Sequence, residues 1–280
     1  MAFEKEIFAE RLRRVRETAP LVQCITNFVT VNDCANILLA AGASPTMACH
    51  VDEVEDAIGG ADGLVCNLGA IEAVESMKRA GVRANILGKP VVLDPVAAGG
   101  TALRRAKSAE LLETVRFTAI RGNASEIAAL AGQNRKGSGV DVGAADVVTR
   151  ENLDSAIEMV SGLARRTGAV IAISGALDLI SDGARSMVLE GGCATMARIT
   201  GSGCMLTTLT GAFCAANPDD PFGAVCAAMA AMNVCGELAE VRRLKNGTGN
   251  ATFRADLIDA VFNLTEAQLM EGVRYEIYEG

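Results

Sequence analysis

The sequence contains no tryptophan and a single histidine, His50, and aromatic residues make up 4% of its 280 residues. So few rings exclude the base-stacking surfaces that single-stranded nucleic-acid binders use. No two of the nine cysteines are spaced as Cys-x-x-Cys, and one histidine cannot complete a zinc site. The cysteines are odd in number and scattered among apolar neighbours. We therefore expect reduced core thiols in a cytoplasmic protein.

The chain is also short of positive charge, with 26 lysines and arginines against 34 aspartates and glutamates, a net charge of −8. Its densest basic stretch, residues 11–16, is typical of a solvated helix face, so no nucleic acid is expected as a partner. No membrane is expected either. Residues 1–20 show a mixed-charge amphipathic helix pattern rather than a signal peptide. The longest apolar stretch, around residues 225–235, reads as too short and too alanine-rich to span a bilayer.

What the sequence does contain is a regular alternation of short apolar runs with helical patterns. The expected strands are residues 21–26, 63–67, 90–94, 117–120 and 169–174, and the helices between them are residues 31–41, 71–80, 101–112, 125–130 and 153–166. Near-continuous apolar runs are typical of strands buried on both faces. The pattern therefore predicts an α/β fold with a mostly parallel central sheet.

The remaining third of the chain predicts a hairpin followed by helices. The hairpin pairs residues 178–181 with 185–190 through Asp182-Gly183, a strong turn signal, and the helices cover residues 203–216, 221–244 and 253–263. No linker rich in proline or serine divides the chain, so we expect one domain over residues 1–280. Residues 133–148, rich in glycine, aspartate and alanine, are expected to form either a surface loop or a mobile flap such as a lid over a ligand.

The most informative local feature is the turn at residues 201–204, which reads Gly-Ser-Gly-Cys and leads directly into a helix. The two glycines, Gly201 and Gly203, allow several backbone N–H groups to point at one place, and the helix start adds its own unpaired N–H groups. Such a site favours phosphate or a developing anion. Cys204 there is expected to have a lowered pKa and to act as a base or nucleophile. An ordinary helix cap is the structural alternative.

Polar residues follow strand after strand at the predicted carboxyl ends, where ligands of open α/β sheets bind. Asp94 and Glu126 are carboxylates suited to a magnesium ion held partly through water. The alternative is that Asp94 caps a turn and Glu126 supports a helix start.

Four further residues are candidates for the site, and two of them have two interpretations. Arg121 at a strand end could pair with a phosphate or form a surface ion pair. Asn123 is a natural helix N-cap. Met47 could line an apolar pocket or belong to the core, and Ser174 offers a hydroxyl at the fifth strand end.

These segments together match a known family. They are ITNFVTVN at residues 25–32, GASPTMA at 42–48, LVCNLG at 64–69, PVVLDPV at 90–96, IRGN at 120–123 and TGSGC at 200–204, with Ala212-Phe213 after them. In these segments the chain resembles the hydroxyethylthiazole kinase family, part of the wider ribokinase-like group. The resemblance implies a ribokinase-like three-layer α/β/α sandwich. It also implies a homotrimer with active sites at subunit interfaces.

The resemblance further implies ATP- and Mg²⁺-dependent phosphorylation of the hydroxyl of 4-methyl-5-(2-hydroxyethyl)thiazole, in thiamine biosynthesis and salvage. The implied roles cover each candidate residue. Met47, Asn27 and Gly201 would contact the thiazole alcohol; Arg121, Ser174 and Asn123 would contact ATP; Asp94 and Glu126 would serve the metal and phosphates; and Cys204, with Gly201 and Gly203, would form the catalytic turn.

Three alternatives remain open from the sequence. One is a kinase for a pyrimidine alcohol, against which the segments around Asn27 and Met47 argue. Another is an ADP-dependent lyase of the same fold that repairs hydrated nicotinamide nucleotides, for which an aspartate is expected at Cys204. The third is a nucleotide-binding regulator without turnover, against which the set of Asp94, Glu126 and Cys204 argues.

Overall fold

The computed structural model of this chain describes residues 4–132 and 147–279. Its centre is a nine-stranded sheet in the order β2-β1-β3-β4-β5-β6-β7-β8-β9. Strands β1 to β6 pair in parallel, and β7, β8 and β9 extend the sheet in antiparallel pairing. In chain order the strands are β1 Leu21–Ile25, β2 Ser44–Thr46, β3 Gly63–Asn67, β4 Val91–Asp94, β5 Ala119–Gly122, β6 Val170–Ile173, β7 Asp178–Ser181, β8 Arg185–Glu190 and β9 Arg274–Glu279.

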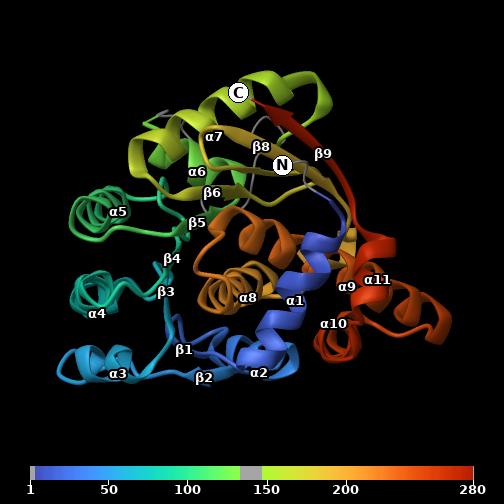
Figure 1. Cartoon of the computed structure of the whole chain (residues 1–280), viewed down its shortest axis with the longest axis horizontal. Helices are drawn as coiled ribbons and strands as arrows, with labels where there is room; N and C mark the ends of the chain where they lie inside the picture. Colours follow the sequence, from blue (N-terminus) through green and yellow to red (C-terminus); the bar gives the residue numbers. More distant parts are fainter. Residues whose placement is uncertain (1–3, 133–146, 280) are drawn as a thin grey trace.

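Helices cover both faces of this sheet and complete a three-layer α/β/α sandwich (Figure 1). One layer contains α3 Val54–Gly60, α4 Val74–Ile86, α5 Ala102–Thr114, α6 Ala124–Leu130 and α7 Leu153–Thr167. The other contains α1 Glu6–Thr18, α2 Val31–Ala41, α8 Ser202–Ala216, α9 Pro221–Asn246, α10 Asn250–Asn263 and α11 Glu266–Gly272. Short 3₁₀ helices, η1 Ile71–Ala73, η3 Arg150–Asn152 and η4 Ala194–Arg198, lie in the connections. The predicted fold class is confirmed.

Each parallel strand contributes side chains to both helical layers. In β3, Leu64 and Cys66 pack with the α3–α7 layer, whereas Val65 packs with the α8–α9 layer. Successive side chains of a strand point to opposite faces, so a sheet that is covered twice needs apolar residues at every position. This is why the strands were visible in the sequence as continuous apolar runs.

Two strands and two α-helices were not predicted: β2, β9, α3 and α11. Strand β2 contains Pro45 and lies at the edge of the sheet, where proline is tolerated because its missing N–H would face no neighbouring strand. Strand β9 forms the opposite edge, and its side chains are only partly buried or exposed. Short or half-exposed elements have only a weak apolar pattern in the sequence. They form because they pair with a longer strand or pack on the core.

Helix α9 corrects one expectation about the apolar stretch near residues 225–235. The helix runs for 26 residues and is long and apolar enough, by length and composition, to cross a membrane. Within the protein, however, 89% of its apolar window is buried. The apolar residues of α9 are thus used for packing between the sheet and α1, α8 and α10, as in the core helix of a folded domain.

Only the end of the segment at residues 133–148, expected to be a surface loop or a flap, is among the residues that the structure describes. Residues 133–146 lie outside the described residues, and Val147 and Val148 lead into η3.

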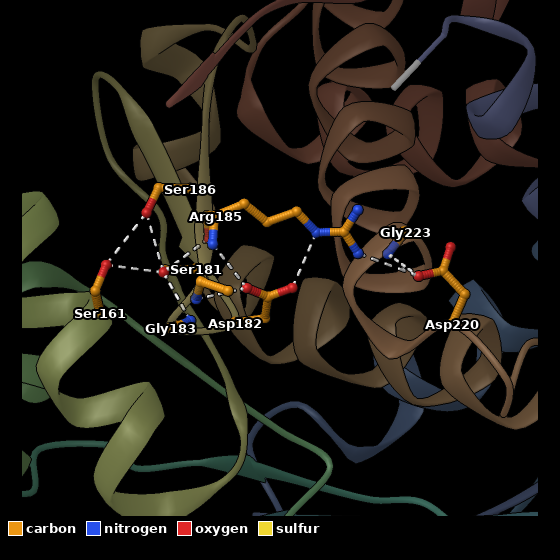
Figure 2. Close-up of polar contacts among 9 residues, drawn as sticks. Ser161, Ser181, Asp182, Gly183, Arg185, Ser186, Asp220 and Gly223 are labelled. Carbon is orange, nitrogen blue, oxygen red and sulfur yellow. Dashed lines mark hydrogen bonds and ion pairs between the residues drawn. The ribbon is translucent and has the colours of Figure 1, made fainter. Parts of the chain in front are cut away.

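The predicted β7–β8 hairpin is confirmed, and its turn rests on a cluster of buried serines (Figure 2). Ser181 Oγ lies 2.9 Å from Ser161 Oγ, accepts from Ser186 Oγ at 3.0 Å, and accepts from the Gly183 N–H at 3.1 Å. Gly183 has a φ of 93°, which favours glycine. Because Ser181 pairs with Ile171 near the start of β6, this turn lies at the amino ends of the parallel strands.

Candidate active site

The carboxyl ends of β3, β4, β5 and β6 meet the N-terminus of α8 at the opposite edge of the sheet. Asn67 ends β3 and Asp94 ends β4, and both contact residues of the first turns of α8. Arg121 near the end of β5 contacts Thr207 of the same helix. This is the edge where ligands of open α/β sheets bind, and the residues predicted from the strand ends are brought together there.

The 201–204 turn approaches its neighbours so closely that both glycines are needed. Gly201 has a φ of 90°, and a Cβ there would lie 2.6 Å from Thr30 Cγ2. A Cβ at Gly203 would lie 2.8 Å from Arg121 Nη1. In the part of the chain that the structure describes, no side chain caps α8. The N–H groups of its first turn, with a guanidinium directly beneath them, therefore form a site for an anion such as phosphate.

A hydrogen-bonded chain of two asparagines connects Cys204 to Asp94. Asn67 Nδ2 lies 3.0 Å from Asp94 Oδ2 and 3.2 Å from Cys204 Sγ. Asn27 Nδ2 lies 3.5 Å from the same sulfur and 3.3 Å from Asn67 Oδ1. Thr207 Oγ1 donates to Asp94 Oδ2 at 2.9 Å. Sequence reasoning placed Asn67 at a predicted strand end but gave it no role, and it missed Thr207, which lies one helical turn beyond Gly203.

Burial is the main cause of the shifted pKa values of Asp94 and Cys204. Asp94 is 2% exposed, and burial raises its pKa to about 7 although the Arg121 guanidinium acts to lower it. Burial and the nearby Asp94 carboxylate raise the pKa of Cys204 to about 11. The expectation of a lowered Cys204 pKa is therefore wrong. The helix N-terminus favours a thiolate, but loss of water and a neighbouring negative charge oppose it more strongly.

Arg121 is a buried residue of the site, so the surface ion pair considered for it is excluded. It is 7% exposed, its Nη2 donates to Ser174 Oγ at the end of β6, and its Nη1 lies 3.5 Å from Thr207 Oγ1. Its Nε is buried without a hydrogen-bond partner among the described residues. A buried guanidinium with a donor to spare is suited to an anionic ligand.

Asn123 and Glu126 form a capping box at the start of α6, as the structural alternative for these residues predicted. Asn123 Oδ1 accepts from the Glu126 N–H at 2.9 Å, and Glu126 Oε2 accepts from the Asn123 N–H at 2.8 Å. Glu126 Oε1 accepts from the Ala97 N–H at 2.8 Å. The carboxylate is thereby held beside the site, and its negative charge contributes to the raised pKa of Asp94.

Met47 lies in the loop that follows β2, partly buried against the apolar core that includes α8. This packing agrees with the core interpretation, and the pocket interpretation stays a prediction. Two apolar residues near the site are far more exposed: Phe28 is 84% and Val29 is 60% exposed, directly after Asn27.

Replacing Gly201 with alanine is expected to lower kcat/KM at least about tenfold. The turn must shift away from Thr30, so its N–H groups no longer point at the anion site. Steady-state kinetics with matched controls would test this. Gly247→Ala has a comparable φ of 62° with nothing within 4 Å of the added Cβ, and should keep full activity. Thr30→Ser combined with Gly201→Ala removes the Thr30 methyl and should recover part of the loss. Equal activity of Gly201→Ala and wild type would contradict the role of this close approach.

The chain matches one family over most of its length. The Hydroxyethylthiazole kinase family model matches residues 12–267. The hydroxyethylthiazole kinase of Clostridium acetobutylicum is 48% identical over 271 residues, which cover 96% of this chain and 99% of that protein. The hydroxyethylthiazole kinase of Desulfovibrio desulfuricans is 46% identical over 266 residues, which cover 91% and 93%.

Solved structures agree. The hydroxyethylthiazole kinase protein of Pyrococcus horikoshii OT3 aligns with a TM-score of 0.85 and 35% identity, over 98% of this chain and 100% of that one. A pyridoxal kinase of Staphylococcus aureus, in complex with AMP-PCP and pyridoxal, aligns with a TM-score of 0.54 and 16% identity over 78% and 87%, a likeness of fold alone. With a family match over residues 12–267 and near-complete coverage by relatives at this identity, the chain belongs to the hydroxyethylthiazole kinase family.

Proposed function

We propose that the protein transfers the γ-phosphoryl group of ATP to the hydroxyl of 4-methyl-5-(2-hydroxyethyl)thiazole, in thiamine biosynthesis and salvage. The observation that carries the proposal is the meeting of the α8 N-terminus, which no described side chain caps, with buried Arg121 and Asp94 at one edge of the sheet. Phosphoryl transfer needs positioning and charge neutralisation more than covalent help, and these groups supply both. The acceptor is inferred from the names of the relatives.

We assign the binding of the phosphate groups to the 201–204 turn and to Arg121. The N–H groups of residues 202–204 would hold the transferred phosphoryl group as charge spreads over its oxygens, and Arg121, oriented by Ser174, would neutralise the outer phosphates. Asn123 would lie at the nucleotide side of the site. Asn27, Met47 and Gly201 would contact the thiazole alcohol.

The donor set fits Mg²⁺. Within residues 4–132 and 147–279, both side-chain hydrogen bonds of Asp94 fall on Oδ2, which leaves Oδ1 for a cation, and the Glu126 carboxylate is held nearby. Among the described residues, no group of three or more His, Cys, Asp or Glu side chains could hold a metal by itself. Two carboxylates completed by water and phosphate oxygens are what Mg²⁺ commonly uses. Bound there, the ion would neutralise the charge of the phosphates.

The raised pKa of Cys204 gives it a different role from the base or nucleophile predicted from the sequence. A thiol whose pKa is raised to about 11 is protonated at neutral pH, so it does not serve as a thiolate base. Asn27 and Asn67 hold the sulfur at the mouth of the turn. We assign Cys204 to orienting the acceptor hydroxyl, which is sufficient where the transition state needs little proton removal.

Cys204→Ala is therefore expected to lower kcat by only about tenfold, less than the hundredfold or more that a positioned proton-transfer group contributes. Cys204→Asp is expected to keep turnover, because a carboxylate at this helix N-terminus can orient the acceptor hydroxyl and accept its proton. Steady-state kinetics at saturating ATP would measure both. A loss of about a thousandfold in Cys204→Ala would restore the base role, and full activity would remove any role for the thiol.

We further propose a single kinase domain that acts as a cytoplasmic homotrimer with active sites at subunit interfaces. All nine cysteines are free, which suits a reducing compartment. Exposed Phe28 and Val29 directly follow Asn27 at the site, where a neighbouring subunit would cover them. Light scattering of the purified protein tests the trimer, and a monomeric mass would overturn it.

The test of the reaction is Mg²⁺-dependent ADP release from ATP, with and without the thiazole alcohol. Strong stimulation by the alcohol, with a product heavier by one phosphoryl group in mass spectrometry, is the expected result. ATP binding without stimulation would reject this acceptor while retaining the nucleotide site. The pyrimidine alcohol and the hydrated nicotinamide nucleotide would then be assayed in that order, and turnover of neither would indicate a regulator.

A further inference from the structure

A hydrogen-bonded pair of a buried carboxylate, Asp178, and a partly buried amide, Asn233, lies beside the nucleotide side of the site and has no role in the reaction described above. Asp178, the first residue of β7, is 4% exposed. Its Oδ2 accepts from Asn233 Nδ2 of α9 at 2.7 Å, and its Oδ1 accepts from the Gly175 N–H at 2.9 Å. Apolar residues follow Asp178 in the same strand, so a carboxylate here costs stability unless both oxygens are used. Both are used.

The first link of the pair leads to Arg121. Gly175, which Asp178 holds, directly follows Ser174, and Ser174 Oγ accepts from the Arg121 guanidinium. The Arg121 charge also acts on Asp178 directly: burial raises the Asp178 pKa to about 6, and the guanidinium acts to lower it. Asp178 is thus connected to the phosphate-binding arginine by a loop of two residues and by charge.

The second link leads to the segment before the 201–204 turn. Asn233 packs against two glycines that follow β8: a Cβ at Gly191 would lie 2.9 Å from Asn233 Cβ, and one at Gly192 would lie 3.3 Å from Asn233 Oδ1. From there the chain runs through η4, where Met196 lies against Gly192 and Gly236. One asparagine on a core helix therefore contacts Asp178, which holds the first loop, and the two glycines that begin the second.

We propose that Asp178 and Asn233 are positioning residues for the nucleotide: their hydrogen bond holds the Ser174–Gly175 loop, and with it Arg121, in the geometry that binds the phosphates of ATP. The proposal rests on the proposed function in that ATP is the phosphoryl donor. Neither residue is assigned a contact with the acceptor. The pair should therefore affect nucleotide affinity and leave acceptor affinity unchanged.

Three variants test the pair. Asn233→Asp places a second carboxylate against the first, Asn233→Leu removes the donor without adding charge, and Asp178→Asn combined with Asn233→Asp exchanges donor and acceptor. The readouts are the Kd of AMP-PCP by calorimetry, measured without acceptor, the KM for each substrate, and Tm. Each single variant is expected to raise the Kd of AMP-PCP and the KM for ATP about tenfold, with the KM for the thiazole alcohol unchanged. The exchanged pair is expected to recover the nucleotide Kd to within about threefold of wild type.

The opposite end of β7 provides a matched control. Ser181→Ala disrupts the serine cluster of Figure 2 in the same strand but at the far edge of the sheet. It should lower Tm and leave the Kd of AMP-PCP unchanged. If both Asn233 variants behave like Ser181→Ala, or if the folded exchanged pair fails to recover the Kd, the pair has only a structural role and the proposal is overturned. Because AMP-PCP binding needs no acceptor, failure of the wild type to phosphorylate the thiazole would reject the proposed substrate separately.

Discussion

Asp94→Asn is expected to lower kcat at least about a hundredfold, the loss typical when one preorganised electrostatic group is removed from a transition state. Asparagine keeps the size of the side chain and can still accept from Asn67 and Thr207. It cannot supply the negative charge that the proposed Mg²⁺ site requires. Single-turnover assays across a range of Mg²⁺ concentrations would measure the loss, and activity within about threefold of wild type would remove Asp94 from the metal site.

The same carboxylate predicts a pH dependence of the wild type. The pKa of Asp94 is raised to about 7, so kcat/KM, which reports the free enzyme, should rise as the pH increases from 6 to 8. Stability should change in the opposite direction. A raised carboxyl pKa contributes stability at low pH that is lost as the pH rises through about 7, and asparagine carries no such cost. The difference in Tm, variant minus wild type, should therefore be more positive for Asp94→Asn at pH 8 than at pH 5.

Asp182→Asn is the control for these measurements. This carboxylate lies in the β7–β8 turn at the far edge of the sheet, and hydrogen bonds from Ala184 and Arg185 lower its pKa although burial acts to raise it. Its contribution to stability is present above its ordinary pKa and is lost at lower pH. The variant should lose Tm at pH 5 and pH 8 alike and keep its kcat. A gain of Tm in Asp182→Asn at pH 8 would show that the Asp94 result does not report burial at the site.

Arg121→Gln is expected to produce the other large effect, a fall of at least about a thousandfold in kcat/KM for ATP, comparable to removal of a phosphate-neutralising arginine in GTPases. Glutamine keeps a donor for Ser174 but loses the charge beneath the 201–204 turn. Arg121→Lys retains the charge without the planar fork, so it should be intermediate.

Steady-state kinetics in ATP, with AMP-PCP affinity measured in parallel, would separate these cases. Arg166→Gln is the matched control, since Arg166 of α7 donates to the Leu130 carbonyl oxygen at 2.6 Å and is exposed. It should keep full activity. A fall in thiazole affinity with unchanged nucleotide affinity in Arg121→Gln would assign the arginine to the acceptor instead.

Much of the fold was predictable because the parallel strands are buried on both faces. Strand β3 and helix α2 have the predicted boundaries, and the hairpin strands β7 and β8 do as well. The other predicted elements differ by a few residues at their ends. The edge strands β2 and β9 escaped prediction because their side chains are not fully buried and their pairing, rather than their apolar content, forms them.

The sequence predicted which residues lie together at the candidate site better than it predicted their pKa values. Strand ends and the 201–204 turn identified Asp94, Arg121, Ser174 and Cys204, which the structure brings together. The pKa of Cys204 was predicted in the wrong direction because it depends on burial and on a carboxylate 110 positions away in sequence, at Asp94. The Asn123–Glu126 capping box, by contrast, involves neighbours in sequence and was foreseen as one of two alternatives.

The sequence by itself therefore determined what depends on local order: which segments are apolar throughout, where each strand ends, which turn needs glycine, and which family the motifs resemble. Only the tertiary structure decided the partners of Asp94, the burial of Arg121 and Cys204, and the pairing of Asp178 with Asn233. The physical reason is distance along the chain. Propensity and periodicity act between near neighbours, whereas desolvation, charge and close packing act between residues that only the folded sheet and its helices bring into contact.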